Sequence, residues 1–459
     1  MRGTHTRGTH TRGSVRRWFG LTLAAILASV GYVLVLPRPA SAAATTNTVY
    51  YWHGVLLDVF RRQGGGPGPL SRGAAMMFGA LYDVLNSADW GRKGYVGTGY
   101  KQAFVLADTD GTVDDDLAAG IAARDALTDA FPAQGAFVAQ KFTERHGSAS
   151  QPAATNLAAQ VVAAVRQNRA NDGSAATPGY TPDGVPGAWR PTGGGCVNPV
   201  DPQWGQVKPF VMSSASQFRQ GLPGGYQTYP ALLASSLYAS VFADVQAYGR
   251  VDSTVRTADQ TQAAWFWAND GNGTYKPPGQ LLEHTRVVAE SRLTNTVLLA
   301  RLFAQVALAM GDAAIAAWDQ KYNTPIDLWR PVTAIQQADT DGNAATAPDP
   351  TWTPLGSTPC FPAWVSGHAT FAAAWAGVMR NQFGDNVTYT AGTDDPNAAG
   401  VTRTFTSFTQ AATEDARSRI YLGVHYQFDA DDGMATGTNV AALAAQRMAA
   451  QKCFDPCLP

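Results

Sequence analysis

The stretch SRIYLGVHYQFD, residues 418–429, constrains this chain more than any other. It brings together a cation (Arg419), a hinge glycine (Gly423), an imidazole (His425) and a carboxylate (Asp429). If a helix begins near Gly423, His425 and Asp429 share one of its faces, and the carboxylate fixes the tautomer of the imidazole. The stretch therefore predicts a catalytic site carried by helices.

Two upstream pieces supply groups that would hold a tetrahedral oxyanion. Arg330 directly precedes a proline, which is preorganised for the first turn of a helix, so we expect Arg330 at the N-terminus of a helix over residues 331–338. Ser366-Gly367-His368 precedes an apolar helix over residues 370–379, whose first turn would offer free N–H groups and a hydroxyl to an anion. The central glycine lets the backbone approach the ligand. Arg419 adds a guanidinium fork for two oxygens.

Composition predicts an all-α protein with a large core. The chain has 459 residues, of which 45% are apolar and only 15% charged, and alanine-rich periodic segments are frequent. The longest pattern, residues 281–319, predicts two helices that are broken near Gly311-Asp312 or pass through it. With 35 acidic and 34 basic residues, no global field steers nucleic acid, so we expect no nucleic-acid partner.

Residues 1–42 read as a signal peptide. Arg16-Arg17 precedes an uncharged run from Trp18 to Leu36, and residues 40–42 offer the small side chains that a signal peptidase recognises. The twin arginine leaves folded export and the Sec route both open. An uncleaved membrane anchor is the alternative. No second apolar run of comparable length is evident, so we expect a secreted protein without a stable membrane span after cleavage.

The mature chain divides into a helical N-terminal region, residues 43–280, and a C-terminal catalytic helical domain, residues 281–459. Between residues 172 and 229 glycine and proline are dense, which predicts a long irregular loop. Loops of this length are uncommon unless they have a function, and one such function is to form a wall of an active-site mouth. We expect a bundle-like core in the C-terminal domain.

Cysteines and acidic strings offer weaker signals. Four cysteines in an exported chain are compatible with two disulfides in any of three pairings: Cys196, Cys360, Cys453 and Cys457. Zinc at the last two is disfavoured because no histidine lies near them. The Asp-x-Asp-Gly strings at residues 108–111 and 339–342 are not followed by the glycine at loop position 6 or the glutamate at loop position 12 that an EF-hand requires. They therefore read as polar turns.

The ordered set of motifs resembles the signature of the vanadium-dependent haloperoxidases and the related type 2 phosphatidic acid phosphatases. It consists of Lys321 followed by Arg330-Pro331, then Ser366-Gly367-His368, then Ser418-Arg419-x3-Gly423-x-His425-x3-Asp429, and the third piece matches at every fixed position. A softer likeness to bacterial, secreted haloperoxidases covers most of the mature chain, including residues 187–192, 204–205 and 250–253. The resemblance implies paired four-helix bundles.

The resemblance also implies a cofactor, vanadate, and a role for each motif residue. His425 would be the vanadium ligand, and His368 would be the acid–base residue beside the cofactor. The vanadate oxygens would be held by Lys321, Arg330, Ser366, the amide of Gly367 and Arg419. The implied reaction is oxidation of halide by hydrogen peroxide to hypohalous acid, which halogenates small organic compounds.

The chain departs from the family pattern at two positions. The segment between Lys321 and Arg330 is two residues longer than usual, so Lys321 would reach the site only if Thr324-Pro325 bulges outward. Val365 stands where proline is usual. Phe361 resembles the phenylalanine of chloroperoxidases rather than the histidine of bromoperoxidases, although an aromatic side chain there is also ordinary packing. Halide range, organic substrate and oligomeric state stay open.

Two other functions fit the same residues. A secreted acid phosphatase would use His425 as a nucleophile that forms a phosphohistidine, with His368 protonating the leaving oxygen, because phosphate and vanadate are both tetrahedral anions. A non-enzymatic oxyanion-binding protein with a vestigial site is the third reading, which the intact pair of histidines disfavours.

Overall fold

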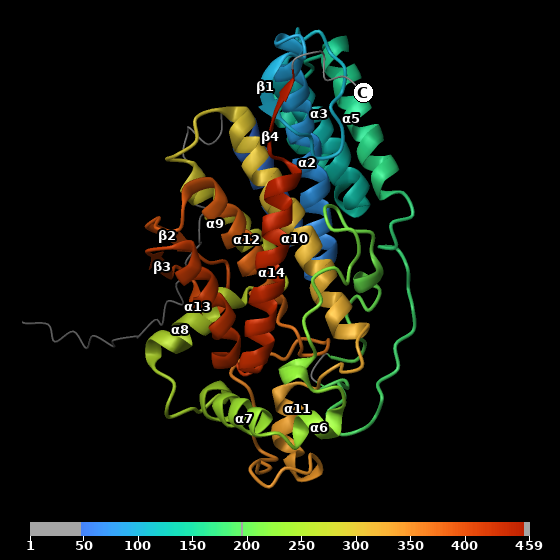
Figure 1. Cartoon of the computed structure of the whole chain (residues 1–459). Coiled ribbons are helices and arrows are strands. Elements are labelled where there is room, and N and C mark those ends of the chain that lie inside the picture. The colour runs from blue at the N-terminus through green and yellow to red at the C-terminus, as the bar shows by residue number, and fades with distance from the viewer. Residues whose placement is uncertain (1–46, 194–195, 454–459) are drawn as a thin grey trace, which may run out of the picture. The chain divides into compact units, whose positions relative to one another are not determined.

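The computed structural model describes residues 47–193 and 196–453, and the expected signal peptide lies outside them. The all-α prediction is confirmed, because helices form the framework of the described residues (Figure 1). These residues also form two small antiparallel sheets. One pairs β1 (Gly97–Tyr100) with β4 (Ala450–Cys453), and the other pairs β2 (Tyr389–Gly392) with β3 (Thr402–Phe405).

Long helices fill the N-terminal region. They are α1 (Thr48–Gln63), α2 (Pro67–Arg92), α3 (Asp115–Ala130), α4 (Gly135–His146) and α5 (Pro152–Arg169). Helix α3 begins where the aspartate run predicts, because the side chain of Asp114 accepts the N–H of Leu117 and the next two aspartates lie in the first turn. Helix α2 is rich in small residues, is buried along most of its length, and packs against α3 and α10.

The expected irregular excursion follows α5. Two short helices appear towards and beyond its end, α6 (Tyr229–Leu233) and α7 (Ser236–Gly249). Its tryptophans Trp189 and Trp204 are buried and anchor the segment to the helices. Single 3-10 turns, here and elsewhere, are η1 (Pro132–Gln134), η2 (Trp204–Gln206), η3 (Pro223–Gly225), η4 (Ala338–Thr340) and η5 (Pro396–Ala398).

The C-terminal part of the chain supplies the central bundle. Its helices are α8 (Ala258–Ala268), α9 (Lys276–Ala289), α10 (Thr296–Tyr322), α11 (Pro331–Gln336), α12 (Gly367–Phe383), α13 (Phe408–Tyr421) and α14 (Gln427–Arg447). Helices α10, α12 and α14 pack against one another, and α13 packs on α12 (Figure 1). The expected domain boundary at residue 281 falls inside α9.

The pattern over residues 281–319 is indeed two helices, but the break lies between α9 and α10 rather than at Gly311-Asp312. Asn295 caps α10, since its side chain accepts the N–H of Leu298. Helix α10 runs through Gly311, and the absence of a side chain there makes room for the ring of Phe210, which lies 2.9 Å from where a Cβ would be. The carboxylate of Asp312 then accepts the N–H groups of residues 210–212.

Helix α10 is long and apolar enough, by length and composition, to cross a bilayer. Among the described helices it alone passes that test, and 94% of its most apolar window is buried inside the protein. The helices around it, α2, α12 and α14, cover it. Such burial is what a core helix of a helical bundle shows.

Glycines let α14 lie close to α12. A Cβ on Gly437 would lie 2.2 Å from the carbonyl oxygen of Thr370, so a larger residue would push the two helices apart. The close packing matters for the site because α12 begins at Gly367 and α14 begins directly after the turn that carries His425.

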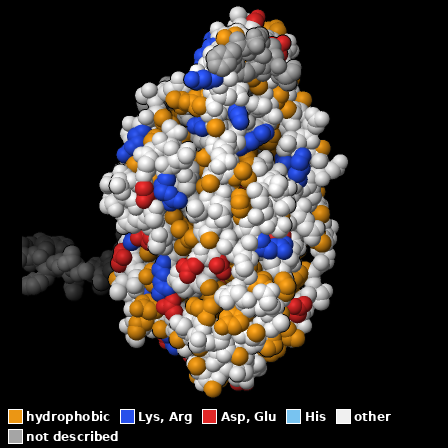
Figure 2. Space-filling view, in the orientation of Figure 1, with side chains coloured by type: hydrophobic (Ala, Val, Ile, Leu, Met, Phe, Trp, Pro, Cys, Tyr) orange, Lys and Arg blue, Asp and Glu red, His pale blue; other side chains and the backbone are white. Residues whose placement is uncertain are grey.

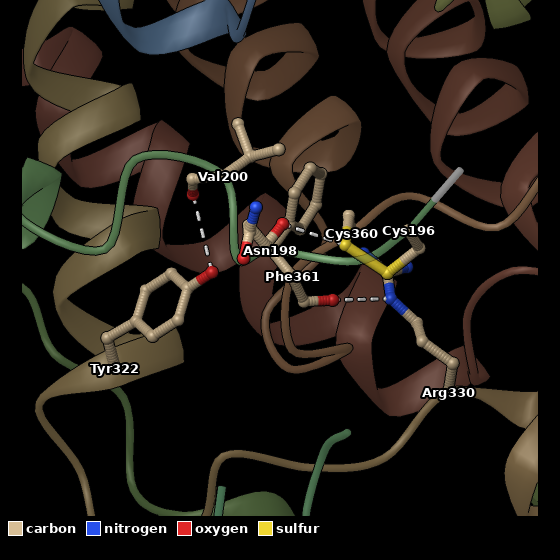
Figure 3. The surroundings of a disulfide bond; sticks show 7 residues. All are labelled: Cys196, Asn198, Val200, Tyr322, Arg330, Cys360 and Phe361. Atoms are coloured by element: carbon tan, nitrogen blue, oxygen red, sulfur yellow. Dashed lines mark hydrogen bonds between the residues drawn. A yellow bond between two sulfur atoms is a disulfide. The ribbon is translucent and has the colours of Figure 1, made fainter. Parts of the chain in front are cut away.

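One disulfide joins the irregular segment to the loop that precedes α12. Cys196 and Cys360 are bonded, with Cα atoms 4.9 Å apart and 164 positions between them in sequence (Figure 3). Backbone bonding supports the junction, because Val200 N donates to Cys360 O at 2.9 Å. This confirms one disulfide within the expected pairings, while the side chains of Cys453 and Cys457 lie outside the described part of the chain.

We predict that replacing the bonded pair, Cys196→Ser with Cys360→Ser, lowers the free energy of unfolding by about 3–5 kcal/mol, because the crosslink closes a very long loop. Urea denaturation of the oxidised wild type and of the double variant measures this difference. An unchanged denaturation midpoint would contradict the expected contribution.

Candidate active site

The three motif pieces come from four helix ends. Arg330 precedes α11, Ser366 caps α12, Arg419 lies in the last turn of α13, and His425 lies in the turn between α13 and α14. The sequence expectation of a helix starting near Gly423 is wrong by about one turn, since α14 begins at Gln427. Gly423 instead has φ +83°, and a Cβ there would lie 2.4 Å from the carbonyl oxygen of Gly249.

His425 and Asp429 nevertheless meet as predicted. The Nδ1 atom of His425 lies 2.9 Å from Oδ2 of Asp429, and Nε2 lies 3.1 Å from Nη1 of Arg330. A guanidinium nitrogen can only donate, so Nε2 must accept and the ring proton must sit on Nδ1. His425 is therefore a neutral imidazole whose unprotonated Nε2 faces the oxyanion-binding groups.

Electrostatics keep this imidazole neutral. Burial lowers the pKa of His425 well below its ordinary value, and the nearby cations Arg330, Lys321 and Arg419 lower it further. Burial also raises the pKa of Asp429 to about 7, although the N–H of Tyr426 and the neighbouring cations oppose the shift. A neutral nitrogen with a free lone pair is what a metal ion or a phosphoryl group requires of histidine.

Arg330 and Arg419 are fully buried, yet part of each guanidinium lacks a partner among the described residues. Arg330 donates to Phe361 O at 2.7 Å (Figure 3). It also donates to Val424 O at 2.7 Å. Its Nη2 has no acceptor, and neither do Nε and Nη1 of Arg419. Leaving buried charged donors unpaired is costly.

These donors therefore fit an oxyanion. The unpaired N–H groups belong to Arg330, which contacts Nε2 of His425, and to Arg419, which lines the same pocket as His425. A tetrahedral oxyanion such as vanadate or phosphate provides the acceptors they lack.

Ser366 and Gly367 supply the helix end. The hydroxyl of Ser366 caps α12 by accepting the N–H of Ala369, and Ser366 is fully buried. The first N–H groups of α12 have no acceptor within the helix and point towards its N-terminal end. A Cβ on Gly367 would lie 3.4 Å from the ring of Trp318, so the backbone here lies in contact distance of one wall of the site.

His368 lies on the same helix end and lines the same pocket as His425. Its Nε2 is 3.1 Å from the carbonyl oxygen of Ala268, so Nε2 carries the proton and Nδ1 is the basic nitrogen. Burial lowers the pKa of His368 to about 4, and Arg419 adds to the effect while Asp270 opposes it. At neutral pH His368 is thus a buried base.

Lys321 does reach this region despite the longer segment that follows it. It lies in the last turn of α10 and is fully buried, and burial beside Arg330 lowers its pKa well below the ordinary value. Its ammonium donates to three carbonyl oxygens of the turn that leads into Ser366, those of Pro362, Ala363 and Val365. Lys321 therefore orders that turn, and its donors are already used.

Sequence reasoning missed Asp270. Its carboxylate accepts Nη2 of Arg419 at 2.7 Å and lies 4.0 Å from Nε2 of His368. Although burial opposes it, the Arg419 guanidinium and His368 lower the pKa of Asp270. The signal was the turn Asn-Asp-Gly-Asn-Gly at residues 269–273, which reads only as a loop until the fold places it over α13.

A pocket of about 530 Å³ opens above these groups. Its base is formed by Gly367, His368, Arg419 and His425, and its aromatic wall by Trp318, Phe361 and Phe371. The irregular segment contributes residues 199–201, as predicted for a wall of the mouth. Phe361 packs with its ring centroid 4.9 Å from that of Trp318 and 4.7 Å from the guanidinium carbon of Arg330.

Comparison with known proteins agrees with this geometry. A family model described as the VCPO second helical-bundle domain matches residues 301–454, a range that holds every motif residue. The vanadium chloroperoxidase of Curvularia inaequalis is 29% identical over 235 residues, which cover 39% of this chain and 38% of that protein. The resemblance to the vanadium-dependent haloperoxidases is confirmed.

Solved haloperoxidase structures share the fold of this chain. A bacterial vanadium-dependent iodoperoxidase gives a TM-score of 0.72 at 23% identity and covers 89% of this chain and 98% of its own. The holo form of a bacterial vanadium-dependent chloroperoxidase gives 0.59 at 16% identity and covers 82% and 92%. The match to the Curvularia haloperoxidase spans well under half of that protein's length, so its activity is not transferred to this chain by similarity alone.

We predict that Asp429→Ala weakens orthovanadate binding about 10- to 100-fold, because His425 loses the acceptor that fixes its tautomer. Equilibrium dialysis gives the dissociation constant. Asp429→Asn keeps an acceptor oxygen and should lose less. Asp431→Ala, an exposed position on the same helix, is the matched control. Equal affinities for the Asp429→Ala and Asp431→Ala variants would contradict the role of the carboxylate.

We also predict that Lys321→Ala weakens orthovanadate binding less than Arg419→Ala does. Arg419 has two unpaired donors for the anion, whereas the donors of Lys321 are taken by carbonyl oxygens. We expect a loss of roughly tenfold for the lysine variant and about 100-fold or more for the arginine variant. Equal losses in the same dialysis assay would show that Lys321 turns towards the anion when it binds.

Proposed function

We propose that this protein is a vanadate-dependent haloperoxidase that oxidises halide with hydrogen peroxide to hypohalous acid, which halogenates an organic compound. The observation that carries the proposal is the set of buried, unpaired guanidinium donors of Arg330 and Arg419 in the site that holds the unprotonated Nε2 of neutral His425. In this proposal His425 ligates vanadium. Arg330, Arg419, Ser366 and the amide of Gly367 hold the oxygens, and Lys321 orders the turn before Ser366.

Vanadate would supply a Lewis acid that activates peroxide without a change in its own oxidation state. The protein supplies charge and proton transfer. The guanidinium groups of Arg330 and Arg419 stabilise negative charge that develops on oxygen in a dry site. The basic Nδ1 of His368 accepts a proton from peroxide and returns it to the leaving oxygen.

An acid phosphatase on the same residues is the competing function. It would need His368 protonated to donate to the leaving oxygen, and the low pKa of His368, about 4, supplies little of that form at neutral pH. A base that takes a proton from peroxide needs the neutral form, which predominates there. At neutral pH this difference favours the peroxidase over the phosphatase, and the haloperoxidase names of the relatives support the same choice.

We further propose that the protein acts outside the cytoplasm. The Cys196–Cys360 bond supports this, since disulfides persist in oxidising compartments. Charge supports a small-molecule role: on the face drawn in Figure 2, acidic and basic side chains are interspersed rather than gathered into one patch.

The deciding experiment uses the phosphate-free protein with and without orthovanadate. We predict peroxide-dependent bromination of a dye only with vanadate, and loss of that activity in His425→Ala while the melting temperature is retained. Hydrolysis of an aryl phosphate is measured in parallel. Hydrolysis that vanadate inhibits, without bromination, would assign the protein to the phosphatases, and turnover retained in His425→Ala would show that the ligand is misassigned.

A further inference from the structure

The pocket is larger than the proposed halide oxidation needs. Vanadate, peroxide and a halide ion together are small, whereas a volume of about 530 Å³ lies in the range of sites for organic ligands. Trp318, Phe361 and Phe371 line the same pocket and give it an aromatic wall. The pocket can therefore hold the organic halogen acceptor itself, next to the place where the oxidised halogen is formed.

Lys276 is a cation on this pocket that the oxyanion site does not use. It lines the pocket together with Pro277, and the residue is only 5% exposed. Its Nζ donates to the carbonyl oxygen of Asp270 at 2.6 Å and to Oδ1 of Asn272 at 3.3 Å. An ammonium has three donors, so one remains for a ligand. No carboxylate forms an ion pair with Lys276 among the described residues.

The backbone at Lys276 adopts a strained conformation. Lys276 has φ +60°, a left-handed conformation that a lysine rarely adopts, and it stands directly before Pro277. Such strain persists where surrounding contacts impose it, and it is common at ligand-binding positions. Here the contacts are those of the 269–276 turn, which also delivers Asp270 to Arg419.

The same turn places the ammonium beside the base of the pocket. Nζ is bonded to the backbone of Asp270, and the carboxylate of that residue contacts Arg419 and approaches His368. Burial lowers the pKa of Lys276, while the Asp270 carboxylate opposes the shift. A poorly solvated ammonium with an unused donor gains from binding an anionic oxygen.

We propose that Lys276 binds the acidic oxygen of a hydroxyarene substrate, so that a phenol is held as its phenolate against the aromatic wall and halogenated inside the pocket. This inference rests on the proposed haloperoxidase function, which supplies the hypohalous acid. A carbon of the phenolate ring attacks the halogen, a carbon–halogen bond forms and the oxygen–halogen bond breaks. The ring proton leaves with the released hydroxide as water, so phenolate and hypohalous acid give halophenolate and water.

A phenolate is complementary to this pocket, because its oxygen is an anion for the Lys276 ammonium and its ring is a planar partner for the aromatic wall. Ionisation makes a phenol electron-rich and therefore reactive towards electrophilic halogen, and an adjacent ammonium favours the ionised form. Ring faces and edges from Trp318, Phe361 and Phe371 suit a planar aromatic ligand. The structural alternative is that Lys276 only closes its own turn.

The test uses 4-nitrophenol, whose phenolate absorbs visible light and which ionises near neutral pH. We titrate it with the vanadate-loaded protein, without peroxide, at a slightly acidic pH where the free probe is mostly protonated. The expected result is a gain of phenolate absorbance on binding. Lys276→Met should weaken binding about 10- to 100-fold and abolish the absorbance gain, because a charged hydrogen bond is lost.

Matched variants separate binding from folding. Lys276→Arg keeps a cation and should retain most of the absorbance gain, and Lys101→Met, an exposed lysine outside the pocket, should behave as wild type. Orthovanadate affinity, measured for each variant, shows whether the base of the pocket is intact. If Lys276→Met loses vanadate as well, the wild-type titration decides: bound probe that ionises at the same pH as free probe would overturn the proposal.

Other results would also overturn it. An undiminished absorbance gain in Lys276→Met would leave the lysine a structural role only. Absence of an absorbance gain in the vanadate-loaded wild type would show that the pocket does not bind the phenolate. Because the probe is read without turnover, these results differ from failure of the proposed function itself, which would show as absence of vanadate-dependent bromination.

Discussion

Burial of several cations around one neutral imidazole is the constraint on which this structure depends. Arg330, Arg419 and Lys321 are fully buried, and each would be costly in a dry interior without acceptors. Burial lowers the pKa of Arg330 to about 9, which shows how strongly the surroundings oppose its charge. Some of the N–H groups of Arg330 and Arg419 have protein acceptors and others have none. The N–H groups without an acceptor are the ones available to bind an anion.

Backbone carbonyl groups meet most of that cost. Lys321 and Arg330 both donate to backbone carbonyl oxygens of the loop that ends at Ser366, so this loop supplies hydrogen-bond acceptors to both cations. Cys360 pins the start of the same loop through its disulfide (Figure 3). The disulfide, the loop over residues 360–366 and the first turn of α12 are therefore continuous in the chain, and together they position the groups that would bind the oxyanion.

The turn at residues 269–276 contributes to the site at both of its ends. At one end Asp270 holds Arg419 and moderates the low pKa of His368. At the other end Lys276 lines the pocket wall. This turn between two helices, which the sequence marks only as glycine-rich and polar, therefore connects two parts of the site. They are the oxyanion-binding groups and the pocket volume available to an organic molecule. The proposed halide chemistry and the proposed substrate binding meet in this one element.

The sequence by itself determined the helical class, the three motif pieces and the His425–Asp429 contact, because these depend on local periodicity and short spacing. It also marked the irregular segment that lines the mouth, since glycine and proline act locally. Long-range placement was beyond it. Asp270 reaches Arg419 across 149 positions, and Cys196 finds Cys360 across 164. The break between α9 and α10 and the later start of α14 depend on local caps, Asn295 and Tyr426 with Asp429, which the apolar periodicity alone did not reveal. Only the tertiary structure decides which carboxylate, carbonyl or cysteine lies beside a buried cation, because that choice follows from how the helices pack and not from any local pattern.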